Sequence, residues 1–341
     1  LLFMRKNYSF VLLFIILFIT TCRKDNDKFC YSSSVSFKIT RHLLEGRKIN
    51  CLATSNDGTL FVGSENDLYI IRGNNQEKFD LGSPVMDIAV DKSSVLWIGT
   101  GGKGLCRLEN RKFTWYNKEN SGFPRDYIAE VEIDKNGNIW FSSCAHMLGG
   151  IGIFNGNKFE FLTPENSPLN QNVISDMVAG EDGAVYIATS GKVGKSNIYR
   201  IYNKEWDCLG NENGTFYWIF SFTVSPAGII YVVEDFSLSS AFETNKVYSF
   251  ENGNWHLLNK NENPPLIHFS TRVIADKRNF CWLASYDNKK HEAVIYVYNG
   301  KSWLKSPDNS FPDDIITTIE TDDENNIYIG TYKNGIFILN Q

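Results

Sequence analysis

Seven segments of the chain repeat one short pattern, in which a turn is followed by an apolar residue, an aromatic residue, and then a small and a hydroxyl residue. The third copy is DKNGNIWFSS at 134–143, with Gly137 in the turn and Trp140 as the aromatic. The aromatic position is filled in every copy, by Phe61, Trp97, Trp140, Tyr186, Tyr231, Trp282 and Tyr328. The six intervals between positions 61 and 328 average about 44 residues, a period typical of a repeated unit of four antiparallel strands.

Each repeat is interpreted as one blade of a β-propeller. In the third repeat the inner strand is 128–134, the second is 139–143 after the turn, and GIGIFNG (150–156) and KFEFLT (158–163) supply the other two. Side chains alternate across a strand, so the aromatic and the small residue two positions later face the same way. We expect the aromatic to pack between blades and the small residue to make room for the next blade. Val233 and Glu234 are the exceptions in the small and hydroxyl positions.

The seventh repeat lacks its fourth strand, because the sequence stops soon after GIFILN. The segment SVSFKITRH at 34–42 has the pattern of a fourth strand and precedes the first inner strand. A strand from the N-terminal side that completes the last blade would close the ring and remove its open edges. The predicted fold is therefore all-β, a seven-bladed β-propeller of four-stranded antiparallel blades over residues 34–341. An open ring and an eight-bladed ring are the alternatives.

The N-terminal stretch has the features of an export signal. A basic pair, Arg5 and Lys6, precedes an apolar run that is too short to span a bilayer but suits a signal peptide. The run ends in ITTC, which resembles a bacterial lipobox, so we predict a lipoprotein signal peptide at 1–21, lipidation of Cys22 and a tether at 22–33. The predicted location is the outer membrane, at its periplasmic or cell-surface face, with the lipid as the only membrane attachment. The alternative is an ordinary secretory signal with an incidental cysteine.

Composition narrows the classes of partner. The chain has 34 basic and 39 acidic residues and a net charge of −5, without a basic block, so nucleic-acid binding is not expected. The seven cysteines form no CxxC pair and no zinc-ligand spacing, so no metal site is predicted from them. Most cysteines lie in apolar strand patterns and are expected to be buried and free. We expect a monomer without a cofactor.

The blade pattern resembles the two-component regulator propeller repeat, which builds sensor domains of Bacteroidetes-type bacteria. Its preceding loops also match, at NSGFPRDYI (120–128), NSPLNQNVI (166–174) and NSFPDDII (309–316). The resemblance covers about 300 residues and is weaker in the fifth and sixth repeats. It implies a sensing or binding scaffold, and the signalling output of the family is not carried over. Sialidase-type Asp-boxes are disfavoured because their Asp, Gly and Trp lie closer together than Asp134, Gly137 and Trp140.

One column of the inner strands is polar between apolar neighbours. Four residues before each turn, the column holds Cys51, Asp87, Glu130, Asp176, Ser221, Arg272 and Thr318. Asp87, Glu130 and Asp176 come from consecutive blades and could form an acidic arc near the channel mouth, able to hold a cation or sugar hydroxyls. The alternative is that these groups only line a water-filled channel.

The loops before the inner strands and the loops between the second and third strands share one propeller face, where ligands usually bind. Candidate ligand-binding residues from these loops are added to Asp87, Glu130, Asp176 and Arg272 of the column. They are Arg125, Tyr127, His146, Tyr217, Trp218, His268 and Tyr286. Phe123 and Phe216 are further aromatics expected near that face, where sugars could stack.

Two function classes remain open from the sequence. The first is a non-catalytic, sensor-like binding module for a glycan, a small molecule or an envelope protein. The second is a polysaccharide lyase or glycoside hydrolase, which would need an acid–base pair in the channel. Asp87, Glu130, Asp176 and His146 are the residues that could supply such a pair. No other catalytic motif is present.

Overall fold

The computed structural model describes residues 35–145, 148–190, 196–210, 216–234, 246–258, 270–287 and 290–341. The predicted signal peptide, Cys22 and the tether lie outside these ranges, as do His146 and His268. The described residues belong to one compact unit. Among the residues that the structure describes, no helix has the length and apolar character needed to span a membrane.

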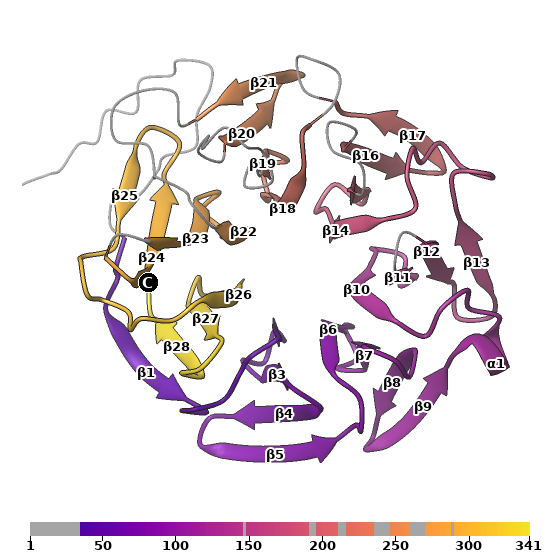
Figure 1. The fold of residues 1–341 in the computed structure, drawn as a ribbon, viewed down its shortest axis with the longest axis horizontal. Helices are drawn as coiled ribbons and strands as arrows, with labels where there is room; N and C mark the ends of the chain where they lie inside the picture. The colour runs from indigo at the N-terminus through magenta and orange to yellow at the C-terminus, as the bar shows by residue number, and fades with distance from the viewer. Residues whose placement is uncertain are drawn as a thin grey trace, which may run out of the picture. The chain divides into compact units, whose positions relative to one another are not determined.

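The described strands form seven antiparallel sheets of four strands, arranged as blades around a ring (Figure 1). The inner strands are β2 (Cys51–Thr54), β6 (Val85–Val90), β10 (Ile128–Ile133), β14 (Ile174–Ala179), β18 (Ile219–Val224), β22 (Ser270–Ala275) and β26 (Ile316–Thr321). The second strands are β3 (Leu60–Ser64), β7 (Leu96–Thr100), β11 (Ile139–Ala145), β15 (Val185–Thr189), β19 (Ile230–Glu234), β23 (Cys281–Asp287) and β27 (Ile327–Thr331). The third strands are β4 (Asp67–Arg72), β8 (Leu105–Glu109), β12 (Leu148–Phe154), β16 (Asn197–Tyr202), β20 (Lys246–Glu251), β24 (Glu292–Tyr298) and β28 (Ile336–Leu339). The outer strands are β5 (Asn75–Asp80), β9 (Lys112–Tyr116), β13 (Phe159–Leu162), β17 (Glu205–Cys208), β21 (Asn254–Leu257), β25 (Trp303–Lys305) and β1 (Ile39–Leu43). A short helix, α1 (Lys118–Ser121), follows β9.

The last blade is closed by the strand from the N-terminal side, as predicted. β1 pairs antiparallel with β28, and Ile39 lies opposite Leu339. Ser36 and Gln341 strengthen this junction, because the Gln341 amide exchanges hydrogen bonds of 2.7 and 3.1 Å with the backbone of Ser36. Inner strands of neighbouring blades contact one another around the whole ring, including β26 with β2. The prediction of a seven-bladed propeller of four-stranded blades is confirmed.

The repeated aromatic has a second role beside packing. Trp140 and Trp282 are buried, and each indole Nε1–H donates to the Asp that begins the turn, at 3.0 and 2.9 Å. Tyr328 donates from its hydroxyl to Asp322 in the same way, at 2.9 Å. The other oxygen of that Asp accepts backbone N–H groups within the turn, as Asp134 does from Asn138. In these three blades the aromatic therefore fixes the turn to the blade core, which explains why an Asp and an aromatic occur together there.

The small residue two positions later lets the next blade approach. A Cβ at Gly99 would lie 2.9 Å from the backbone oxygen of Ile128, and a Cβ at Gly330 would lie 2.7 Å from Ile49 Cγ2. Ile128 begins the next inner strand β10, and Ile49 lies two residues before the inner strand β2. The hydroxyl residue that follows caps the loop, since Thr100 Oγ1 donates to the Gly104 carbonyl at 2.7 Å.

The described cysteines Cys51, Cys106, Cys208 and Cys281 are all free. Three of them are buried, as expected for thiols in apolar strand patterns, whereas Cys208 is exposed. Cys208 is the last residue of the outer strand β17, where it and the preceding Asp207 are both exposed.

The close approach of blades at Gly99 predicts a large effect of adding one methyl group. Gly99→Ala should lower the free energy of unfolding by about 1–3 kcal/mol, because the obstacle is backbone that cannot move aside freely. Gly102→Ala is the matched control: Gly102 is exposed and its added Cβ would lie 3.9 Å from its nearest neighbour, so it should change stability by less than about 0.5 kcal/mol. Urea unfolding of both variants measures the difference, and equal stabilities would contradict the packing role of Gly99.

Candidate functional site

The polar column of the inner strands lines the central channel. A cavity of about 240 Å³ lies at this level, and all seven column residues contribute to its wall: Cys51, Asp87, Glu130, Asp176, Ser221, Arg272 and Thr318. The pairing register of the inner strand shifts just before the column residue, for example between Val85 and Asp87. Such a bulge redirects a side chain. The column residues, which include the predicted acidic arc of Asp87, Glu130 and Asp176, therefore line one shared cavity, and their role in ligand binding stays a prediction.

Two of the predicted carboxylates accept hydrogen bonds from the next blade. Asp87 Oδ2 accepts a 2.7 Å hydrogen bond from the backbone N–H of Val131 in the following blade. Asp176 Oδ2 accepts from Ser221 Oγ and from the backbone N–H of Phe222, both at 3.0 Å. The inner strand has no strand on its channel side, so side chains satisfy its exposed N–H groups.

Arg272 lies against the acidic arc. Its guanidinium is 3.7 Å from Glu130 Oε1 and 3.8 Å from Asp176 Oδ2. Burial raises the pKa of Glu130 well above its usual range, although Arg272 acts in the opposite direction. Burial likewise raises the pKa of Asp87 to about 6, against the effect of the Val131 N–H. The arc therefore retains protons more strongly than exposed carboxyls do.

Two further carboxyls in the channel were missed from the sequence. Glu132 and Glu320 lie two residues after the column on their inner strands and line the same cavity. Burial raises the pKa of Glu320 to about 8, opposed by the backbone N–H of Thr321. Burial also raises the pKa of Glu132 well above its usual range, and the charges of Asp87 and Asp176 add to this effect. The alternation of side chains that placed Glu130 in the channel would have placed Glu132 there too.

The mouth formed by the starts of the inner strands, here called the loop-side mouth, holds a pocket of about 400 Å³. Its wall is mainly apolar and includes Trp218, Phe220 and Ile315. Phe220 is 39% exposed and Ile315 is 50% exposed, which is unusual for large apolar side chains. Arg272 lines both this pocket and the central cavity, so it connects the two.

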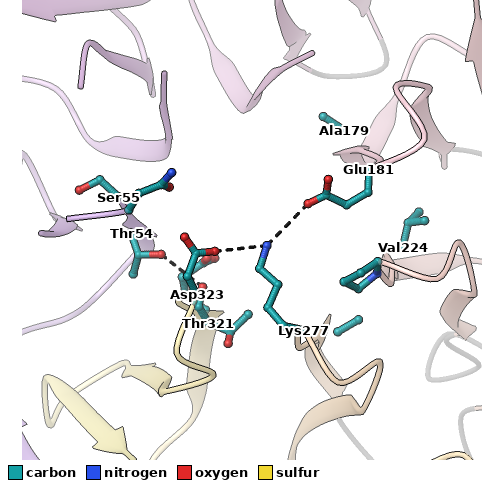
Figure 2. A pocket seen from close by; sticks show the side chains of 12 residues that line it. Thr54, Ser55, Ala179, Glu181, Val224, Lys277, Thr321 and Asp323 are labelled. Atoms are coloured by element: carbon teal, nitrogen blue, oxygen red, sulfur yellow. Dashed lines mark hydrogen bonds and ion pairs between the residues drawn. The ribbon is translucent and has the colours of Figure 1, made fainter. Parts of the chain in front are cut away.

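The opposite mouth is formed by the turns that follow the inner strands, and we call it the turn-side mouth. A cavity of about 240 Å³ lies there (Figure 2). Lys277 extends across it between blades, with Nζ 3.6 Å from Glu181 and 3.3 Å from Asp323. Glu320 lines both this cavity and the central one. Sequence reasoning assigned these turns to the scaffold and did not find this cation.

The other predicted site residues take different positions. Arg125 is exposed, and its backbone carbonyl accepts a hydrogen bond of 2.9 Å from Ser143 Oγ. The Tyr286 hydroxyl donates a hydrogen bond of 2.5 Å to Asp313. The backbone of Tyr127 forms a β-bridge with Gly101, and the Tyr217 N–H donates to Glu234 at 2.6 Å. None of these four is among the residues that line the three cavities described above.

Two aromatics expected near the ligand face lie in the core instead. Phe123 is 3% exposed and packs on Phe141 with ring centroids 4.9 Å apart. Phe216 is fully buried and packs edge-on against Trp255. Both lie in loops that look exposed in the sequence, but each ring packs between neighbouring sheets. The expectation that they face the ligand was wrong.

The fold is shared with solved structures of low sequence identity. Virginiamycin B lyase from Staphylococcus aureus has a TM-score of 0.69 at 14% identity, with 89% of this chain and 98% of the lyase covered. The extracellular domain of the hybrid two component system BT3049 from B. thetaiotaomicron has a TM-score of 0.64 at 18% identity, with 87% of this chain and 40% of that chain covered. PorZ, a surface component of the type-IX secretion system of Porphyromonas gingivalis, has a TM-score of 0.66 at 15% identity, with 85% and 46% covered.

These similarities show that this chain shares its fold with an enzyme and with the extracellular domain of a two component system. The chain spans less than half the length of the BT3049 domain and of PorZ. No family model matches the sequence, and neither does any curated protein. The resemblance to the regulator propeller repeat therefore stays a prediction from sequence motifs.

The hydrogen bonds of Asp176 predict a stabilising role. Asp176→Ala should lower the free energy of unfolding by about 1–3 kcal/mol, because the buried Phe222 N–H loses its acceptor. Asp176→Asn keeps an oxygen acceptor and should cost less. Asp207→Ala, at a 62% exposed side chain on β17, serves as the control and should be nearly neutral. Denaturant unfolding checks this order, and a neutral Asp176→Ala would show that the blade contact is dispensable.

The raised pKa of Glu320 predicts a pH-dependent stability. The folded protein binds this proton more tightly than the unfolded chain, so the free energy of unfolding should fall as pH rises from about 5 to about 8. Glu320→Gln carries no charge and should flatten this part of the profile, making the variant more stable than wild type above pH 8. Glu205→Gln on the exposed outer strand is the control. An unchanged slope in Glu320→Gln, measured by urea unfolding between pH 5 and 9, would contradict the assignment.

Proposed function

We propose that this protein is a non-catalytic, sensor-like binding module of the cell envelope that holds its ligand at the loop-side mouth of the channel. The observation that carries the proposal is the pocket of about 400 Å³, with Trp218, Phe220 and Ile315 in its wall and Arg272 at its junction with the channel. Ligand pockets commonly combine an apolar wall with a few polar groups that set orientation. This volume is in the range of such pockets.

The contacts of the carboxylates favour binding over catalysis. A lyase or hydrolase would need an acid and a base that are free to reach the substrate. Asp87 and Asp176 instead accept hydrogen bonds from the backbone of the next blade, and Glu130 faces Arg272. The acidic arc therefore serves ring assembly, and the open apolar pocket is the surface left for a ligand.

An envelope location is part of the proposal. It is supported by the signal-like N-terminal stretch and by the fold shared with an extracellular sensor domain and a bacterial surface component. Lipidation of Cys22 would attach the protein to the outer membrane without a spanning helix. The partner class at the pocket is a glycan or small molecule, and an envelope protein is the alternative.

Trp218 provides the direct test. We expect the mature protein, solubilised in detergent, to bind members of a glycan array, and we expect Trp218→Ala to weaken each positive binder at least tenfold in calorimetry, because stacking on an aromatic face is lost. Tyr202→Ala is the matched control, since Tyr202 is also exposed (42%) but lies on β16, away from the pocket.

Two outcomes would overturn the proposal. The first is binding that survives Trp218→Ala unchanged, which would place the ligand elsewhere. The second is cleavage of a bound oligosaccharide that Glu130→Gln abolishes, which would make the protein an enzyme.

A further inference from the structure

Arg272 offers hydrogen-bond donors to the loop-side pocket. A guanidinium carries five N–H donors. Its carboxylate neighbours stand at 3.7 and 3.8 Å, beyond hydrogen-bond distance, and its side chain is 33% exposed. Within the described part of the chain, the Arg272 side chain makes no hydrogen bond. A planar cation with open donors lies where the pocket meets the channel.

The pocket wall indicates which chemical groups the ligand carries besides its charge. Trp218, Phe220 and Ile315 present apolar surface, to which one face of a ring can be applied. Two hydroxyl residues, Ser175 and Thr317, complete the wall. The Thr317 hydroxyl proton is donated to the Ile49 carbonyl at 2.6 Å, so its oxygen is left to accept a hydrogen bond. A ring with an apolar face, hydroxyl groups and an anionic substituent fits these features.

We propose that the ligand is an acidic sugar, a hexuronate, whose ring stacks on Trp218 and whose carboxylate is bound by Arg272. This inference rests on the proposed function, because it names the ligand class of the same pocket. A guanidinium and a carboxylate match in geometry and can form two parallel hydrogen bonds. A neutral sugar would leave these donors unused, so the pocket should discriminate between the two.

The charged and titratable groups around Arg272 set the pH dependence. They are Glu130 and Glu132 on β10, Asp87 on β6, Asp176 on β14, Glu320 on β26 and Cys51 on β2. Burial raises the pKa of each of these groups, to about 6 for Asp87 and about 8 for Glu320. Burial alone would lower the pKa of Arg272, but Glu130, Asp176 and Asp87 raise it, so the guanidinium stays charged.

Proton binding by these carboxyls reduces their repulsion of an incoming anion. A bound carboxylate in turn raises their pKa values further, so binding takes up protons. The affinity for a hexuronate should therefore increase as pH falls from 8 to 6. A neutral sugar should show no such trend.

The experiment compares digalacturonic acid with the neutral disaccharide galactobiose by calorimetry on the mature full-length protein. We expect digalacturonic acid to bind more tightly at pH 6 than at pH 8. Arg272→Gln should weaken its binding at least tenfold, whereas Arg272→Lys should retain part of it because the charge is kept. Thermal unfolding of both variants verifies that they are folded. Trp218→Ala removes the aromatic wall but keeps Arg272, so it distinguishes the contribution of the wall from that of the charge.

The outcomes distinguish this inference from the proposed function. Trp218-dependent binding of galactobiose as tight as that of digalacturonic acid would overturn the hexuronate assignment and leave the binding module intact. Binding of phenylacetate in place of both sugars would retain the role of Arg272 but overturn the sugar. Failure of digalacturonic acid to bind would overturn the inference. Failure of every glycan on the array to show Trp218-dependent binding would overturn the proposed function as well.

Discussion

Each blade of this ring presents toward the axis a strand whose second edge has no neighbouring strand. Backbone N–H groups on that edge need acceptors, and at three blade junctions a side chain of the preceding blade supplies one. Asp87 and Asp176 act in this way, and Ser221 Oγ also accepts the Val273 N–H at 3.3 Å. The requirement explains why the column is polar while its flanks are apolar. The same requirement limits which groups can bind a ligand, because a carboxylate oxygen that accepts a backbone N–H is not available to a ligand.

Arg272 is the column residue that makes the channel a candidate site. It occupies the column position of the sixth blade but has no acceptor to offer the next strand, so it turns its charge toward Glu130 and Asp176. The same side chain reaches the apolar pocket at the loop-side mouth. At the turn-side mouth Lys277 plays a comparable part between Glu181 and Asp323 (Figure 2). Among the described residues, the acidic channel thus has Arg272 near one mouth and Lys277 near the other.

The repeat made the architecture predictable from the sequence. Its aromatic, small and hydroxyl positions follow from packing between blades, and the missing fourth strand pointed to the segment before the first inner strand. The column was predictable for the same reason, because a fixed distance from the turn and a period of two place a side chain in the channel. Glu132 and Glu320 obey that rule and were overlooked. Phe123 and Phe216 were misplaced because the sequence of a loop does not distinguish an aromatic that enters the core from one that stays exposed. The pocket around Trp218 depends on how four inner strands meet, which no single repeat encodes.

The closing sheet has a consequence for the order of events in folding. β1 pairs with β28, so β1 cannot find its partner strand until the C-terminal end of the propeller has been synthesised. Ile39, for example, pairs with Leu339. Six blades can form from neighbouring segments as the chain emerges, but the seventh cannot be completed until β28 exists. Contacts of such long separation in sequence are slow to form. Pairing of β1 with β28 thus completes the last blade and removes its open edge, but it takes place late in the assembly of the ring.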